Sequence, residues 1–191
     1  MALDKKDFEG MRKEIETYDE KREELIRQSR DIIKLSKQII YAVHRKEMKN
    51  AEKDLEEIKK IVVKISEKVK KDPKLDIGSF KEGIQEYVEA AAYYYFEKEN
   101  KIPKRTELNV DTEYYLLGLC DLTGELVRNA VNSGINDNTE KVIKIKEFVD
   151  ELYDELMQFD LRNSELRRKV DAVKWDLKKL DDLVFGLKMR K

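Results

Sequence analysis

Two pairs of acidic residues lie in the least charged stretches of a chain that is otherwise rich in charge. Glu86 and Glu89 are three positions apart, and Asp121 and Glu125 are four positions apart, so each pair would share one face of a helix. A carboxylate that leaves water is costly unless it is paired, protonated or bound to a cation. These four acids are therefore the candidate chemical site, and a divalent metal is one reason for their placement.

The surroundings of the second pair distinguish it from a chance arrangement. In a chain with 41 acidic residues, pairs at helical spacing recur by chance, and most are solvated or paired with lysine. Between positions 114 and 127, however, Asp121 and Glu125 are the only charged side chains, and a helix that is apolar nearly all round is buried. If this helix adjoins the one that carries the first pair, four carboxylates could converge. Oxygen ligands without His or Cys favour Mg²⁺ or Mn²⁺ over Zn²⁺.

The single histidine narrows the chemistry further. A di-iron site in a helical bundle uses Glu-x-x-His motifs, and His44 has Tyr41, not an acid, three positions earlier. Nucleophilic Ser-His-Asp or Cys-His catalysis is unfavoured because one histidine, far in sequence from the lone Cys120, would have to serve. The single cysteine also excludes an intramolecular disulfide framework.

A row of basic residues is a second candidate feature. Its members follow one another at steps of three and four along the first predicted helix: Arg27, Arg30, Lys34, Lys37, Tyr41 and His44. The window 21–49 holds nine Lys or Arg against four acids, a local excess of positive charge that suits phosphate binding. A solvated helix face is the alternative interpretation.

Composition and periodicity predict the elements that position these residues. With 2 prolines and 7 glycines in 191 residues, long helices are favoured over sheet, and the length fits a single helical domain over residues 1–191. Apolar spacing predicts an all-α bundle of about six to seven helices with a very long N-terminal helix, on the order of 60 Å. The expected helices cover 3–45, 49–70, 76–99, 111–133, 139–159 and about 166–186, with an exposed loop at 100–109. No apolar run is long enough to span a membrane, and a cytoplasmic location is expected.

Several sequence blocks together resemble the translin family. They are Ser29-Arg30-Asp31-Ile32, Ser36-Lys37, Val43-His44-Arg45, the stretch from Gly83 to Ala90, and the stretch from Tyr115 to Arg128. Together with the tail from Lys174 to Lys188, the blocks span nearly the whole chain in the family's order. The chain is more similar to TRAX, the catalytic member, than to translin, the RNA-binding scaffold. The absence of an extended basic N-terminal region is more typical of a prokaryotic, archaeal member.

The resemblance implies a Mg²⁺- or Mn²⁺-dependent endoribonuclease that cleaves single-stranded RNA inside a closed homo-oligomeric shell of about eight subunits. Glu86, Glu89 and Asp121 correspond to the family's essential acids, with Glu125 beside them as a further ligand or base. Single-stranded RNA is the expected partner, with minor binding of single-stranded DNA. The expected RNA-binding residues are Arg27, Arg30, Lys34, Lys37, Tyr41, His44, Arg45 and Arg128.

Two alternatives remain. The first is a non-catalytic, translin-type scaffold that binds RNA through the basic row, and the second is a coiled-coil assembly protein without an RNA role. Self-association is expected in each case, because the first helix carries two adjoining apolar rows that one bundle partner cannot easily cover. One row is Leu25, Ile32 and Ile39, and the other is Ile26, Ile33 and Ile40.

Overall fold

The computed structural model describes residues 3–162 and 164–189, and this part of the chain contains seven α-helices, one short 3-10 helix and no strand. The prediction of an all-α bundle with a very long first helix is confirmed. The helices are α1 (Lys5–His44), α2 (Met48–Lys71), η1 (Pro73–Leu75), α3 (Gly78–Glu99), α4 (Arg105–Leu108), α5 (Thr112–Ile135), α6 (Thr139–Met157) and α7 (Glu165–Met189).

The ends of the longest helices follow from local chemistry. Asp4 caps α1 by accepting hydrogen bonds from the backbone N–H groups of Lys6, at 2.9 Å, and Asp7, at 3.4 Å, which satisfies donors that the first turn leaves free. Helix α2 ends at Lys71 because Asp72 precedes Pro73, and a residue before proline disfavours the helical conformation.

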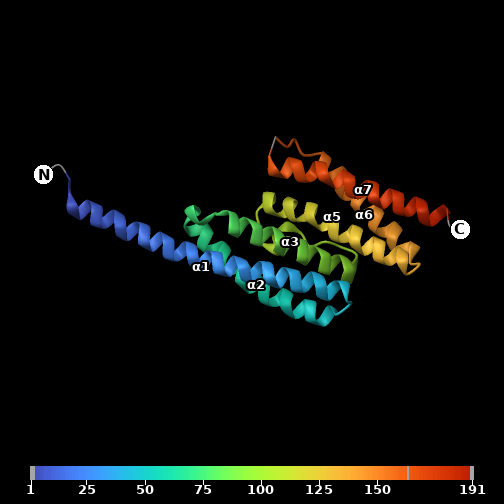
Figure 1. Ribbon diagram of the computed structural model, residues 1–191, viewed down its shortest axis with the longest axis horizontal. Helices are drawn as coiled ribbons and strands as arrows, with labels where there is room; N and C mark the ends of the chain where they lie inside the picture. The colour runs from blue at the N-terminus through green and yellow to red at the C-terminus, as the bar shows by residue number, and fades with distance from the viewer. Residues whose placement is uncertain (1–2, 163, 190–191) are drawn as a thin grey trace.

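The helices form a layered bundle. Helix α1 packs against α2 and α3, α3 packs against α5, and α5 packs against both α6 and α7 (Figure 1). Their apolar faces share a continuous core, in which Tyr87, Tyr93 and Leu126 are almost fully buried. Across the described residues, no helix has the length and apolar character needed to cross a bilayer.

The predicted loop at 100–109 contains one helical turn that the sequence did not indicate. Helix α4 begins after Lys104, whose backbone N–H donates to the carboxylate of Glu107 at 2.7 Å. Asn109, which has a positive φ of 53°, ends it. A four-residue helix is too short to show apolar periodicity, so this turn depends on its end contacts.

The two apolar rows of the first helix were expected to leave apolar surface for contacts between subunits, and this expectation is wrong in detail. Leu25, Ile32 and Ile39 are fully buried, as expected, but Ile40 is buried as well and the rest of the second row is half-buried. Both rows are covered because α1 contacts α2 and α3 together.

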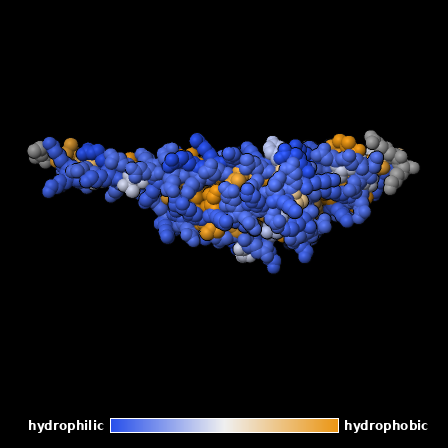
Figure 2. All heavy atoms as spheres, turned by 90° about the horizontal axis from the view of Figure 1, so that it is seen from below, coloured by the Kyte–Doolittle hydropathy of each residue, from blue (hydrophilic) through white to orange (hydrophobic). Residues whose placement is uncertain are grey.

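Apolar residues are instead exposed in the N-terminal part of α1, which projects beyond the bundle (Figure 1). Phe8, Met11 and Ile15 follow one another at helical spacing and are 44%, 45% and 61% exposed. Figure 2 shows this projection as a narrow, mainly hydrophilic rod with isolated hydrophobic spots. The unpartnered apolar surface of α1 is therefore at its start and not in its middle.

Candidate metal and nucleic-acid site

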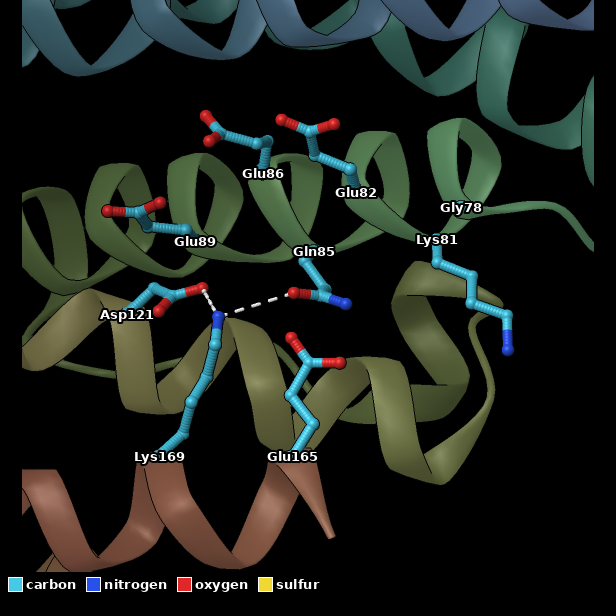
Figure 3. A pocket seen from close by; sticks show the side chains of 9 residues that line it. All are labelled: Gly78, Lys81, Glu82, Gln85, Glu86, Glu89, Asp121, Glu165 and Lys169. Atoms are coloured by element: carbon cyan, nitrogen blue, oxygen red, sulfur yellow. Dashed lines mark hydrogen bonds and ion pairs between the residues drawn. The ribbon is translucent and has the colours of Figure 1, made fainter.

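Three of the four predicted acids line one cleft of about 660 Å³ between α3, α5 and α7. Glu86 and Glu89 come from α3 and Asp121 from α5, and Figure 3 shows the carboxylates of Glu89 and Asp121 on facing helices. The other lining residues are Gly78, Lys81, Glu82, Gln85, Glu165 and Lys169. The cleft thus holds five acidic and two basic side chains.

A glycine allows α3 and α5 to approach closely at this point. A Cβ added to Gly118 would lie 2.6 Å from Cβ of Val88 and 2.8 Å from the carbonyl oxygen of Gln85. Gly118 is one turn before Asp121, and Val88 lies between Glu86 and Glu89. The close helix contact therefore brings acids more than thirty positions apart in sequence to the same cleft.

Burial and mutual repulsion shift the protonation of the acids on α3. Burial, followed by the negative charges of Asp121, Glu86 and Glu125, raises the pKa of Glu89 to about 8. Burial also raises the pKa of Glu86, and the positive charge of Lys37 opposes that shift. In the absence of a cation, a proton is therefore the partner of Glu89 at neutral pH.

A lysine from α7 partly neutralises the cleft. The Nζ atom of Lys169 lies 2.5 Å from Oδ2 of Asp121 and 3.3 Å from Oε1 of Gln85 (Figure 3). Within residues 3–162 and 164–189, no three acidic, His or Cys side chains converge closely enough to enclose a metal ion. The donors still fit Mg²⁺ or Mn²⁺, because Mg²⁺ is usually bound by one or two carboxylates, waters and substrate phosphates and not by an all-protein cage.

Glu125 lies outside the cleft lining and contacts His44. The Nε2 atom of His44 lies 2.5 Å from Oε2 of Glu125, and the Tyr93 hydroxyl lies 3.1 Å from Nδ1. Since Asn129 donates to this hydroxyl at 2.8 Å, Tyr93 is free to donate to Nδ1, which leaves the proton on Nε2 facing Glu125. The hydrogen bond from His44 lowers the pKa of Glu125, and the Arg128 charge adds to this effect.

The basic row lies on the exposed face of α1. Four of its members are exposed and form no ion pair within the described part of the chain, namely Arg27, Arg30, Lys34 and Lys37. The predicted RNA-binding residue Arg45 is also exposed, but it pairs with Glu47 at 3.1 Å.

Arg128 of α5 adds one more basic side chain beside this row. The guanidinium of Arg128 lies 5.9 Å from the centre of the exposed Tyr41 ring, although Arg128 is far from Tyr41 in sequence. The predicted RNA-binding residue His44 is turned inward, since its side chain is 10% exposed and both ring nitrogens have partners. A direct RNA contact by His44 would require these bonds to break.

Sequence reasoning missed several side chains of the cleft. Glu82 precedes Glu86 by four positions, so helical spacing could have identified it. Glu165 and Lys169 lie in the first two turns of α7. The packing of α7 against α5 has no signal in the local sequence. Their place in the cleft follows from tertiary packing alone.

An acid-lined cleft beside an exposed basic helix face, in an all-α bundle, defines a class of helical protein suited to binding cations and polyanions. The sequence pattern of the Translin family matches residues 20–191, and the chain belongs to this family. Translin-associated protein X of Rattus norvegicus is 24% identical over 228 aligned positions, which cover 96% of this chain and 78% of that protein.

Solved structures share the whole fold. The crystal structure of apo-NeC3PO is 36% identical, has a TM-score of 0.90, and the match covers 98% of this chain and 99% of that one. The structure of an AfC3PO complex with duplex RNA is 23% identical, with a TM-score of 0.88 and coverage of 96% and 97%. The second likeness concerns the fold alone.

Proposed function

We propose that this protein is a Mg²⁺- or Mn²⁺-dependent endoribonuclease that cleaves single-stranded RNA within a closed homo-oligomer. The observation that carries the proposal is the meeting of Glu86, Glu89 and Asp121 in one cleft. These are the acids that resemble the essential acids of TRAX. The likeness to Translin-associated protein X over 96% of the chain supports the same function.

The charges of the cleft explain why a cation and a basic surface are both needed. Five carboxylates line the cleft, and they would repel the phosphates of RNA. One or two of the acids Glu86, Glu89 and Asp121, together with waters and phosphate oxygens of the RNA, would hold the ion. When bound, the ion would activate a water and neutralise the charge that builds up on the scissile phosphate.

The chain's own residues would position the RNA. The exposed row of Arg27, Arg30, Lys34 and Lys37 lies on α1, and the charge of Lys37 reaches Glu86 in the cleft. Phosphate contacts of this kind set the register of a strand without reading its bases. Tyr41, with Arg128 against its ring, offers a face on which a base can stack.

Glu125 would support the site and not hold the ion directly. Its carboxylate is bonded to His44, and its lowered pKa makes it a weak proton acceptor. Its negative charge nevertheless contributes to the raised pKa of Glu89. We therefore propose that Glu125 tunes the charge of the cleft.

A non-catalytic RNA-binding scaffold is the second candidate function. It is favoured by one observation, the pairing of Asp121 with Lys169 where a metal ligand is expected. Because the structure of AfC3PO contains duplex RNA, we would test both single-stranded and duplex RNA as ligands.

Incubation of the purified protein with end-labelled RNA, single-stranded and duplex, separates the two candidates. Cleavage of the single strand with Mg²⁺ or Mn²⁺, and none with EDTA, is expected for the nuclease. Salt-sensitive binding without cleavage in any metal would leave the scaffold function, and the absence of binding would remove both.

A further inference from the structure

Lys169 enters the acidic cleft from the side opposite to Glu86 and Glu89. It lies on the second turn of α7, and its side chain reaches across to Asp121 of α5 and Gln85 of α3. Figure 3 shows this side chain extending from α7 toward the two facing helices. One ammonium group therefore joins all three helices that form the cleft.

The pair formed by Lys169 and Asp121 differs from an ordinary surface ion pair. The two side chains are 27% and 34% exposed, and the residues are 48 positions apart in sequence. The positive charge also acts on Glu86 and Glu89. Lys169 is thus a cation bonded to one of the acids proposed to hold a metal, Asp121, and its charge acts on the other two.

An ammonium and a divalent ion compete for the same oxygen of Asp121, because both carry positive charge. Mg²⁺ binds carboxylate oxygen at about 2.0–2.1 Å, and a lysine ammonium this close to the ion would meet strong repulsion of like charges. Lysine carries its charge on a flexible four-carbon chain. The cleft of about 660 Å³ leaves space for that chain to move.

We propose that Lys169 is a built-in counter-ion of the cleft, which a divalent cation displaces from Asp121 and whose released ammonium then binds a phosphate of the RNA. This inference rests on the proposed function, because it assumes that the cleft binds a metal. It assigns Lys169 two successive partners. Before metal binding it reduces the repulsion between Asp121 and the acids of α3, and afterwards it supplies positive charge to the substrate.

The first part is tested by Mn²⁺ binding to the purified full-length chain without RNA, measured by titration calorimetry and by the electron paramagnetic resonance of free Mn²⁺. Lys169→Met removes the competing charge and should tighten Mn²⁺ binding about tenfold, which corresponds to about 1.4 kcal/mol. Lys169→Arg keeps the charge and should bind like the wild type. Lys178→Met, an exposed position further along α7, is the matched control, and circular dichroism shows whether each variant is folded.

The outcomes separate this inference from the proposed function. Mn²⁺ binding that is tighter in Lys169→Met, but not in Lys169→Arg or Lys178→Met, supports the displacement. This also holds if the wild type binds Mn²⁺ too weakly to measure. Equal or weaker binding by Lys169→Met, with a wild type that binds, overturns the role of Lys169 and leaves the metal site in place. If neither protein binds Mn²⁺, both the metal site and the displacement are wrong.

The second part is tested at saturating Mn²⁺ with labelled single-stranded RNA. Lys169→Met should then cleave on the order of tenfold more slowly than wild type, because one charge-assisted phosphate contact is lost, and Lys169→Arg should retain most of the rate. A Lys169→Met variant that binds metal more tightly and cleaves as fast as wild type would overturn the phosphate contact.

Discussion

Gly118 packs directly against Val88, with room for a hydrogen atom but not for a methyl group. This contact sets the distance between α3 and α5, and Asp121 is one turn further along α5. We expect Gly118→Ala to lower the free energy of unfolding by about 1–3 kcal/mol, the usual cost of overpacking, and to slow RNA cleavage.

Gly124 is a matched control on the same helix, because an added Cβ there meets no atom within 4 Å. Gly124→Ala should stabilise the protein by about 0.5–1 kcal/mol through helix propensity. Thermal and urea unfolding measure both effects. Equal stability changes in the two variants would show that the close contact at Gly118 is not what limits the helix spacing.

The raised pKa of Glu89 predicts that the metal-free protein loses stability with rising pH. The pKa is about 8 in the folded protein, against a reference of 4.5. Below pH 4.5 the carboxyl is protonated in both the folded and the unfolded state, and its favourable contribution to the free energy of unfolding is complete. As the pH rises from 4.5 to about 8, the unfolded chain releases the proton first. The contribution of Glu89 to the free energy of unfolding is therefore lost by about pH 8.

Melting temperatures between pH 4.5 and 8 check this expectation. Glu89→Gln should flatten the decline, and Glu99→Gln, at the exposed end of α3, should follow the wild type. The same titration predicts tighter Mn²⁺ binding at higher pH, since the ion must replace the proton. An identical pH profile for wild type and Glu89→Gln would show that Glu89 titrates in its usual range.

The basic row should bind RNA through phosphates and without sequence preference. Replacing Arg30 and Lys37 with Gln should reduce the slope of log affinity against log salt by about 1.4, or roughly 0.7 per contact for a single strand. The pair Lys53→Gln and Lys60→Gln, exposed on α2, removes the same charge elsewhere. If both double variants change the slope equally, the row on α1 is an ordinary solvated face.

The exposed apolar residues at the start of α1 should form a subunit contact. We expect the chain to assemble into a closed particle of about eight copies, because closed symmetry covers the same patch on every subunit. Replacing Phe8 and Ile15 with Glu places charge on this row and should lower the particle mass. Light scattering that gives 22.7 kDa, the mass of one chain, for the wild type would contradict the assembly.

The long helices were predictable because apolar periodicity and prolines act locally. The structure places α1 at Lys5–His44 and ends α2 before Pro73, close to the expected bounds. Apolar spacing does not show which helix packs against each apolar face, so the burial of Ile40 was not predicted. The single turn of α4 was missed because it is too short to be periodic.

The candidate site was predictable in part. Helical spacing and an apolar setting pointed to Glu86, Glu89 and Asp121, and the structure places these three in the lining of one cleft. The contacts that tune them lie between distant segments. Neither the bond from His44 to Glu125 nor that from Lys169 to Asp121 has a local sequence signal.

The most direct test of the account is the rate of Mg²⁺-dependent cleavage of labelled single-stranded RNA by site variants that preserve shape. Glu89→Gln and Asp121→Asn should each lower the cleavage rate at least about 100-fold, while RNA binding and folding persist. Residues that support metal ligands without touching the ion usually cost less than this when they are replaced. Glu99→Gln should cleave like the wild type. Wild-type rates for both Glu89→Gln and Asp121→Asn would contradict the assignment of this cleft as the nuclease site.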